Sequence, residues 1–144
     1  MNSRIRQAVI WAVSEAFGLP VHIDTIEQDL EEPCFLITSL NKTENHVVMD
    51  RYQRQYPYMI QYFPSSPDYR TECDDVSDRL FDVLECVRYQ DILYRADSMS
   101  GETQGGILNF SVTYKPMVIK KRKPDTGEEA FMEILEQNMD MKED

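Results

Sequence analysis

The sequence is poor in the residues that build catalytic and metal centres. It has two histidines, three cysteines and five glycines in 144 residues. No two cysteines have the C-x-x-C spacing of a metal or redox site, and Gly105-Gly106 lacks the Lys-Ser/Thr of a phosphate-binding loop. Catalysis needs several titratable groups brought together, and few candidates are present. The composition therefore predicts no enzyme, no catalytic residue, no cofactor and no metal site.

The candidate groups that do occur each have a simpler structural interpretation. His22 and Asp24 would share one face of a short strand, which favours a solvated strand face over a pair of metal ligands. His46 has no second ligand at a recognised spacing. Asp74-Asp75 is the arrangement expected at a helix start, where carboxylates complement the helix dipole. We expect all three cysteines to be buried and reduced, namely Cys34, Cys73 and Cys86.

Positive charge and long hydrophobic runs are also scarce. Asp and Glu outnumber Lys and Arg by 26 to 15, and the formal net charge is −11. Because nucleic-acid affinity comes chiefly from basic side chains on phosphates, the chain is not expected to bind DNA or an anionic membrane tightly. No stretch approaches the roughly 20 apolar residues that cross a bilayer, and the apolar run 8–13 meets Glu15 too early for a secretion signal. We expect a soluble, non-secreted protein.

What the sequence has in abundance is tyrosine on one long strand, over residues 51–64. Its alternation places these side chains on one face: Tyr52, Arg54, Tyr56, Tyr58, Ile60 and Tyr62. Cys34–Leu40 is the expected antiparallel partner, Asn41–Asn45 the expected polar link, and Pro57 marks an edge or bulge. The strand exceeds the usual 3–10 residues, so one end of the hairpin is expected to project. We expect proximal tyrosines in the core and distal ones at a protein contact.

The remaining pattern predicts an α+β fold. The expected elements are helices over Ser3–Phe17 and from Asp74 or Asp75 to about Val87, a strand over Val21–Ile26, a second hairpin from Ile92 through Gly101 and Gly105-Gly106 to Tyr114 or Val118, and a helix from about Glu128. Strands grouped in hairpins with helices between them indicate a mainly antiparallel sheet with two helices packed on one face, a long projecting β-hairpin and a short C-terminal helix. We expect one domain over residues 1–123 and an acidic C-terminal helix or tail over 124–144.

The only basic cluster is Lys120–Lys123. An exposed strand end is the interpretation that we favour. The main alternative is pairing with an acidic face of a neighbouring copy, and a phosphate-binding or nuclear-targeting patch is a further one.

Several local stretches resemble the tail terminator proteins of tailed phages and prophages of Gram-positive bacteria. They are Leu30–Phe35, Asp50–Arg54, Tyr62–Pro64, Leu93–Arg95 and Gly106–Phe110, and the resemblance covers nearly all of residues 3–120. None of these stretches is catalytic. The resemblance implies an α+β fold and a structural phage or prophage protein that caps the tail tube as an oligomeric ring, a hexamer. The ring ends tube polymerisation and forms the head-joining surface.

The resemblance also implies partners and a location. The partners are further copies of the chain, the tail-tube protein and the head–tail connector protein. The location is the virion tail, after synthesis in the bacterial host cytoplasm. We expect the self-assembly interface within the reaching segment Asn41–Tyr56, at Asn41, Lys42, Arg51, Tyr52, Arg54 and Tyr56.

Two other functions remain open at this stage. A head–tail connector or neck adaptor shares this kind of fold and would bind the portal side instead of the tail tube. A non-viral module that binds a small molecule or peptide on the open face of the sheet would be a monomer with a pocket.

Overall fold

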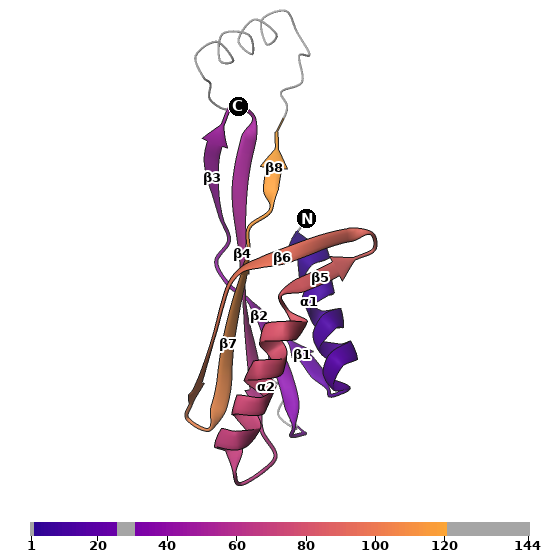
Figure 1. Ribbon diagram of the computed structural model, residues 1–144, viewed down its shortest axis with the longest axis vertical. Coiled ribbons are helices and arrows are strands. Elements are labelled where there is room, and N and C mark those ends of the chain that lie inside the picture. The colour runs from indigo at the N-terminus through magenta and orange to yellow at the C-terminus, as the bar shows by residue number, and fades with distance from the viewer. Residues whose placement is uncertain (1, 26–30, 121–144) are drawn as a thin grey trace, which may run out of the picture. The chain divides into compact units, whose positions relative to one another are not determined.

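The computed structural model describes residues 2–25 and 31–120. Within them the chain forms two helices and eight strands (Figure 1). In chain order they are α1 (Asn2–Phe17), β1 (Val21–Ile23), β2 (Cys34–Ser39), β3 (Thr43–Val48), β4 (Arg51–Phe63), α2 (Tyr69–Val83), β5 (Cys86–Tyr89), β6 (Ile92–Gln104), β7 (Ile107–Tyr114) and β8 (Met117–Ile119). The predicted α+β class is confirmed in this broad form. The predicted C-terminal helix and tail, over residues 124–144, lie outside the described residues.

The chain divides into two compact units. The first unit comprises Met1–Asn41 and Tyr56–Tyr114, and the second comprises Lys42–Gln55 and Lys115–Asp144. Strand β4 contributes to both, with residues 51–55 in the second unit and 56–63 in the first. The single domain expected over residues 1–123 stays a prediction.

The sheet of the first unit is mixed and centred on β4 and β7. Its strand order is β1-β2-β4-β7-β6-β5. Strand β1 runs parallel to β2, whereas the other neighbours are antiparallel. In the middle of this sheet Ile60 lies opposite both Ile37 and Phe110. The expected antiparallel pairing of residues 34–40 with the Tyr-rich strand is therefore confirmed.

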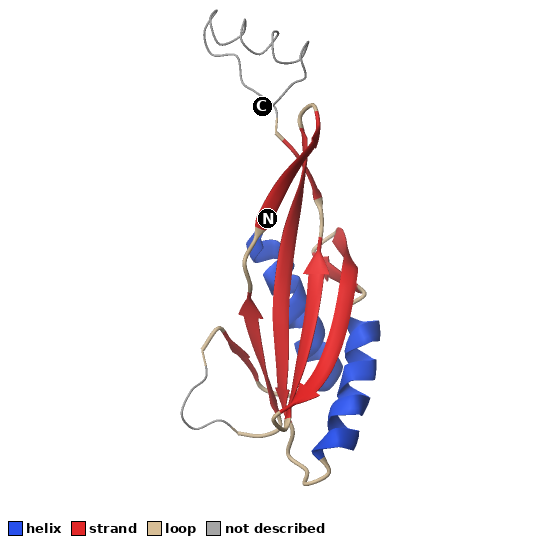
Figure 2. Cartoon of the chain, turned by 90° about the vertical axis from the view of Figure 1, so that its left-hand side faces the viewer, coloured by secondary structure: helices blue, strands red, loops and turns tan. Residues whose placement is uncertain are grey.

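One face of this sheet builds the core together with both helices. The inward residues alternate along β2, β4 and β7, as the period of two predicts: Phe35, Ile37, Tyr56, Tyr58, Ile60, Tyr62, Leu108, Phe110, Val112 and Tyr114. Against them pack Ile5, Ala8, Val9 and Val13 of α1 and Cys73, Val76, Leu80 and Leu84 from α2 and its end. Figure 2 shows both helices on the same side of the strands. The expected packing of two helices on one face is confirmed.

The C-terminus of α1 follows an ordinary capping rule. Gly18 has φ +64°, and its N–H donates to the carbonyl oxygen of Ser14 at 2.9 Å, which ends the helix in the left-handed conformation that glycine adopts without strain. The helix already includes Asn2, so the expected start at Ser3 is one residue late.

Helix α2 begins about five residues before the predicted start. Asp68 occupies its N-cap position, and Asp74 and Asp75 lie within the helix. The Glu72 carboxylate accepts hydrogen bonds from the backbone N–H groups of Ser65 and Ser66, at 3.1 and 3.0 Å. The loop is thereby closed onto the first turn, which allows the helix to start earlier than the acidic pair indicates.

The predicted hairpin link is wrong. Thr43–Val48 forms strand β3, which pairs with residues 51–55 of β4, and the turn lies at Met49-Asp50. All six residues of β3 are exposed. Because both faces of β3 are exposed, its sequence does not alternate between apolar and polar residues. Its polar residues therefore predicted a loop.

The second predicted hairpin is confirmed with two corrections. Gly105 and Gly106 have φ +64° and +78°, as a two-residue turn of the primed kind requires. Gly101 lies within β6 and not in the turn. Strand β7 ends at Tyr114 and does not extend to Val118. After Pro116 the chain forms a separate strand, β8, which pairs with residues 51–53 of β4.

Candidate functional site

The second unit contains a three-stranded antiparallel sheet with the start of β4 in the middle. Strand β3 pairs along one side, with Thr43 opposite Gln55 and His46 opposite Tyr52. Strand β8 pairs along the other side, with Arg51 opposite Ile119. Among the described residues neither β3 nor β8 has a second partner strand. Both outer edges therefore offer backbone N–H and C=O groups to a further strand.

A bridging carboxylate holds the three strands together. Glu44 of β3 accepts a hydrogen bond from Arg54 Nε at 2.6 Å and another from Lys120 Nζ at 2.6 Å. These bonds, first from Lys120 and then from Arg54, lower the pKa of the Glu44 carboxyl below its ordinary value. Glu44 thus remains charged and links β4 to the end of β8.

One tyrosine is the only buried residue of this unit within the described ranges. Tyr52 is 9% exposed. The His46 ring lies against it with ring centroids 4.7 Å apart, and Lys120 Nζ lies 4.6 Å from the ring centre. His46 of β3 and Lys120, which directly follows β8, therefore both pack against the ring.

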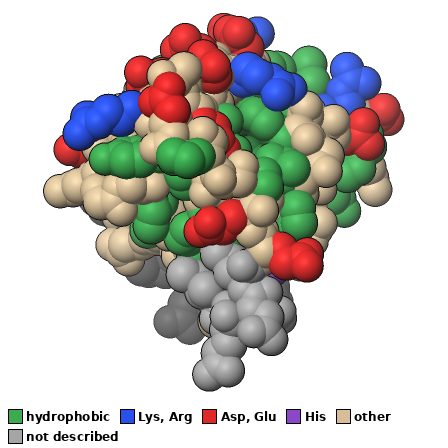
Figure 3. All heavy atoms as spheres, turned by 90° about the horizontal axis from the view of Figure 1, so that it is seen from below, with side chains coloured by type: hydrophobic (Ala, Val, Ile, Leu, Met, Phe, Trp, Pro, Cys, Tyr) green, Lys and Arg blue, Asp and Glu red, His purple; other side chains and the backbone are tan. Residues whose placement is uncertain are grey.

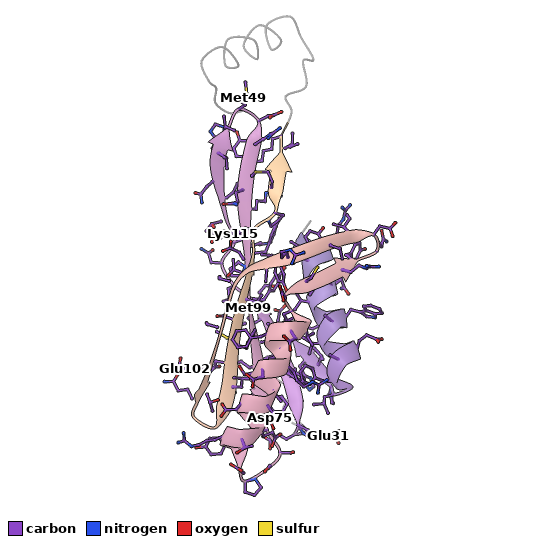
Figure 4. All side chains as sticks on the ribbon, in the orientation of Figure 1. Glu31, Met49, Asp75, Met99, Glu102 and Lys115 are labelled. Carbon is purple, nitrogen blue, oxygen red and sulfur yellow. The ribbon has the colours of Figure 1, made fainter. Side chains whose placement is uncertain are left out.

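The rest of the second unit exposes apolar side chains. Val47, Val48 and Met49, at the end of the β3–β4 hairpin, are 52%, 51% and 56% exposed. On β8 Met117 and Ile119 are similarly exposed. Figure 4 shows Met49 at the hairpin turn. Open strand edges beside exposed apolar residues are typical of a surface that binds another protein.

The predicted interface residues fall into two groups. Asn41, Lys42 and Arg51 are exposed. Arg54 is half-buried and paired with Glu44. Tyr52 is covered within the second unit, and Tyr56 is 3% exposed in the core of the first. The structure therefore brings Lys42, Arg51, Tyr52 and Arg54 into one unit, with Asn41 and Tyr56 in the other.

Several residues of this surface were not predicted from the sequence. Glu44 lies in the stretch that is predicted to be a link, and none of the predicted interface residues lies in the apolar run 47–49. Three apolar residues directly before Asp50 could have indicated an exposed hairpin end. Lys120 was noted only as part of the basic cluster, whose other members lie outside the described residues.

The described parts of the two units carry opposite charge, although the whole second unit, with residues 121–144 included, has nine Lys and Arg against ten Asp and Glu. The described part of the second has five Lys and Arg against two Asp and Glu, a net +3. The described part of the first has six Lys and Arg against fourteen Asp and Glu, a net −8. Figure 3 shows acidic side chains spread among hydrophobic and neutral ones on one face. The excess of positive charge in the described part of the second unit makes its three-stranded sheet suited to an acidic partner.

Tyr62 and Glu72 form a hydrogen-bonded cluster of titratable groups in the first unit. The Tyr62 hydroxyl donates to the Glu72 carboxylate, and burial followed by this bond raises the pKa of Tyr62. Burial alone would raise the pKa of Glu72, but the hydrogen bonds from Tyr62, Ser65 and Ser66 outweigh it and lower that pKa. This cluster fastens α2 to the end of β4.

The described residues contain no grouping of three or more His, Cys, Asp or Glu suited to a metal ion. Asp24 follows β1 with φ +66° and lies 4.0 Å from Arg6, so its expected place in the strand beside His22 is wrong. Cys34 and Cys73 are buried, and burial raises the pKa of both thiols. Cys86 is exposed on β5, which corrects the expectation for that residue.

Comparison with known proteins identifies the family. A sequence profile described as phage tail terminator protein matches residues 4–126. The chain belongs to the phage tail terminator family. Membership of this typically non-enzymatic family supports a structural role in a phage tail, in agreement with the resemblance seen in the sequence.

The other comparisons add little to this family assignment. No curated protein matches the chain. One solved structure aligns with 85% of this chain and 98% of its own, with a TM-score of 0.42 and 10% identity. Neither helix in the described part of this tail terminator family member is long and apolar enough to span a bilayer.

Proposed function

We propose that this chain caps the phage tail tube as an oligomeric ring, a hexamer, ends its polymerisation and forms the surface that the head joins. Its partners are further copies of itself, the tail-tube protein and the head–tail connector protein. It acts in the virion tail after synthesis in the host cytoplasm, and has no enzymatic activity. Family membership supports the tail location and the structural role.

The observation that carries the assembly proposal is the exposed sheet of the second unit. A ring needs a surface that contacts a different surface of the next subunit, and closure of the ring then uses up every such surface. The open edges of β3 and β8 can add strands, and the exposed residues Val47 and Met49 can be buried by a neighbour.

The six predicted interface residues take three roles in this proposal. Lys42 and Arg51 are exposed in the second unit and contact the neighbouring subunit, and Asn41 is a further contact from the first unit. Tyr52 and Arg54 keep the three strands in register through their contacts with Lys120 and Glu44. Tyr56 anchors its strand in the core of the first unit.

The test is removal of residues Lys42–Val48, which eliminates β3. None of these residues belongs to the core of the first unit. The shortened chain should therefore keep its circular dichroism spectrum and a cooperative thermal transition. Negative-stain images of tail tubes mixed with the full chain should show a ring at one tube end, and images with the shortened chain should not.

A deletion outside the second unit serves as a matched control. Shortening the Gly105-Gly106 turn leaves β3 and β8 intact, so rings should still form if the variant folds. Rings that persist on tubes with the Lys42–Val48 deletion would remove β3 from the interface. Full-length chain that never binds tube ends would overturn the capping function.

A further inference from the structure

Helix α2 has few basic side chains to offset its acidic ones. Helix α2 carries two arginines. Arg79 donates to the carbonyl oxygen of Ala16 and lies over the Phe17 ring at 4.1 Å, so it is committed to the end of α1. Arg70 lies 5.6 Å from the ring centre of Tyr69. Among the described residues neither arginine forms an ion pair with a carboxylate of α2.

The outer side of α2 is a row of exposed carboxylates, Asp74, Asp75, Asp78 and Asp82. Asp74 and Asp78, and Asp78 and Asp82, are four residues apart, a spacing at which like charges destabilise a helix. Within the described ranges none of the four forms an ion pair. A charge pattern that opposes helix formation is consistent with a basic partner.

The exposed bases of the second unit have the complementary character. Lys42 and Arg51 are exposed, and among the described residues neither forms an ion pair. They lie in the described part of the second unit, which carries a net charge of +3; Lys42 precedes β3, and Arg51 begins the central strand β4. A chain with net charge −11 repels its own copies unless surfaces of opposite sign meet. A head-to-tail ring contact joins two different surfaces of the same chain, and these two differ in sign.

We propose that the second unit of one copy, around Lys42 and Arg51, docks on the acidic outer face of α2 in the next copy. The partner that binds the three-stranded sheet is then a second copy of this chain, and charge complementarity favours this pairing. This inference rests on the proposed ring function and names the surface that receives the sheet. Apolar residues 47–49 would be covered in the same contact.

A charge-exchange experiment tests this pairing. One variant carries Lys42→Glu and Arg51→Glu, another carries Asp78→Lys and Asp82→Lys, and a third carries all four changes. Sedimentation velocity over a concentration series, with and without tail tubes, measures self-association. Each double variant should weaken association at least about tenfold, and the fourfold variant should recover most of that loss because the pairs are restored in reverse.

Single reversals elsewhere on the first unit provide matched controls. Arg88 on β5 and Glu102 on β6 are exposed and lie outside α2; Figure 4 labels Glu102 on its strand. Arg88→Glu and Glu102→Lys should associate like the unmodified chain. If a double variant fails to fold by circular dichroism, the neutral changes to Gln and Asn replace the reversals, with a smaller expected loss.

The outcomes separate this inference from the proposed function. One outcome would reject α2 as the acceptor but leave the ring proposal standing. In it, self-association is weakened by reversing Lys42 and Arg51. It is not weakened by reversing Asp78 and Asp82, and it does not recover in the fourfold variant. Rings unaffected by either pair would also reject the docking. A chain that stays monomeric at all concentrations and on tube ends would reject both.

Discussion

The two units of this protein are stabilised in different ways, although one strand runs through both. In the first unit the inward side chains of β4, from Tyr56 to Tyr62, are covered by two helices and form a continuous apolar core. In the described part of the second unit Tyr52 alone is buried, under His46 and Lys120. A unit with an apolar core is stable by itself. A small sheet that is held together mainly by polar side chains is stabilised most when a partner binds to it.

The largest expected effect is a cavity in the core of the first unit. Phe110 is fully buried, and its ring lies 4.9 Å from that of Phe81. Phe110→Ala should lower the free energy of unfolding by about 3–5 kcal/mol, measured by urea denaturation. Val47→Ala in the second unit, at a 52% exposed position, should stay within about 0.5 kcal/mol of the unmodified chain. Equal losses would contradict the contrast between the units.

A smaller loss is expected from overpacking at Gly101. A Cβ atom there would lie 2.6 Å from Ser77 Oγ and 3.0 Å from Phe110 Cδ2. Gly101→Ala should therefore lower the free energy of unfolding by about 1–3 kcal/mol. The same change in a Ser77→Ala background should cost less, because the nearer contact is gone. If Gly101→Ala lowers the free energy of unfolding equally in both backgrounds, the contact with Ser77 is not the source of the strain.

Next in size is the carboxylate that fastens α2 to β4. Glu72→Gln should cost about 1 kcal/mol near neutral pH, since a charged acceptor of three hydrogen bonds is replaced in a partly exposed site. The pKa of Glu72 is lowered from 4.5 on folding. Its contribution is therefore present above about pH 4.5 and is lost as the pH falls through the lower folded value.

The measurement is the free energy of unfolding of the unmodified chain and of Glu72→Gln as a function of pH. Urea denaturation of the two proteins should give curves that separate at neutral pH and converge in acid. Asp74→Asn, a control on the exposed face of the same helix, should show no such convergence. A Glu72→Gln difference that grows as the pH falls would contradict the assignment.

The smallest effect on global stability is expected in the second unit. Glu44→Gln removes the charge that binds Arg54 and Lys120, yet the thermal midpoint should hardly move because the core lies in the first unit. Hydrogen exchange at the backbone N–H of Lys120, which donates to the Asp50 carbonyl, should become several-fold faster. Because the pKa of Glu44 is lowered on folding, the difference should vanish as the pH falls through that value.

Glu102→Gln is the control for this local effect. Glu102 is exposed on β6 in the first unit and should leave exchange at Lys120 unchanged. A global loss of stability on changing Glu44 would show that the two units unfold together and would weaken the comparison.

The core could be predicted from sequence because its signal is periodic. Tyr56, Tyr58, Ile60 and Tyr62 alternate, and helix residues such as Val76 and Leu80 recur at helical spacing. Gly18 and the Gly105-Gly106 pair likewise mark conformations that favour glycine. In these segments local sequence and burial agree, so the pattern was enough.

The second unit could not be predicted in the same way. Strand β3 is exposed on both faces and has no periodic signal, and β8 is defined only by pairing with residues more than sixty positions away. The Glu44 cluster depends on that pairing, since Lys120 reaches Glu44 across the sheet. Val87 lies in β5 and not in the predicted helix, because it pairs with Tyr94 in a local hairpin with β6.

Growth of the tail tube tests the central proposal most directly. Tail-tube protein should be polymerised with and without this chain, and tube lengths measured in negative-stain images. Capping predicts that tubes stop growing once the chain is added, with a ring on one end. Tubes that continue to lengthen at the same rate, with no chain bound at their ends, would contradict it.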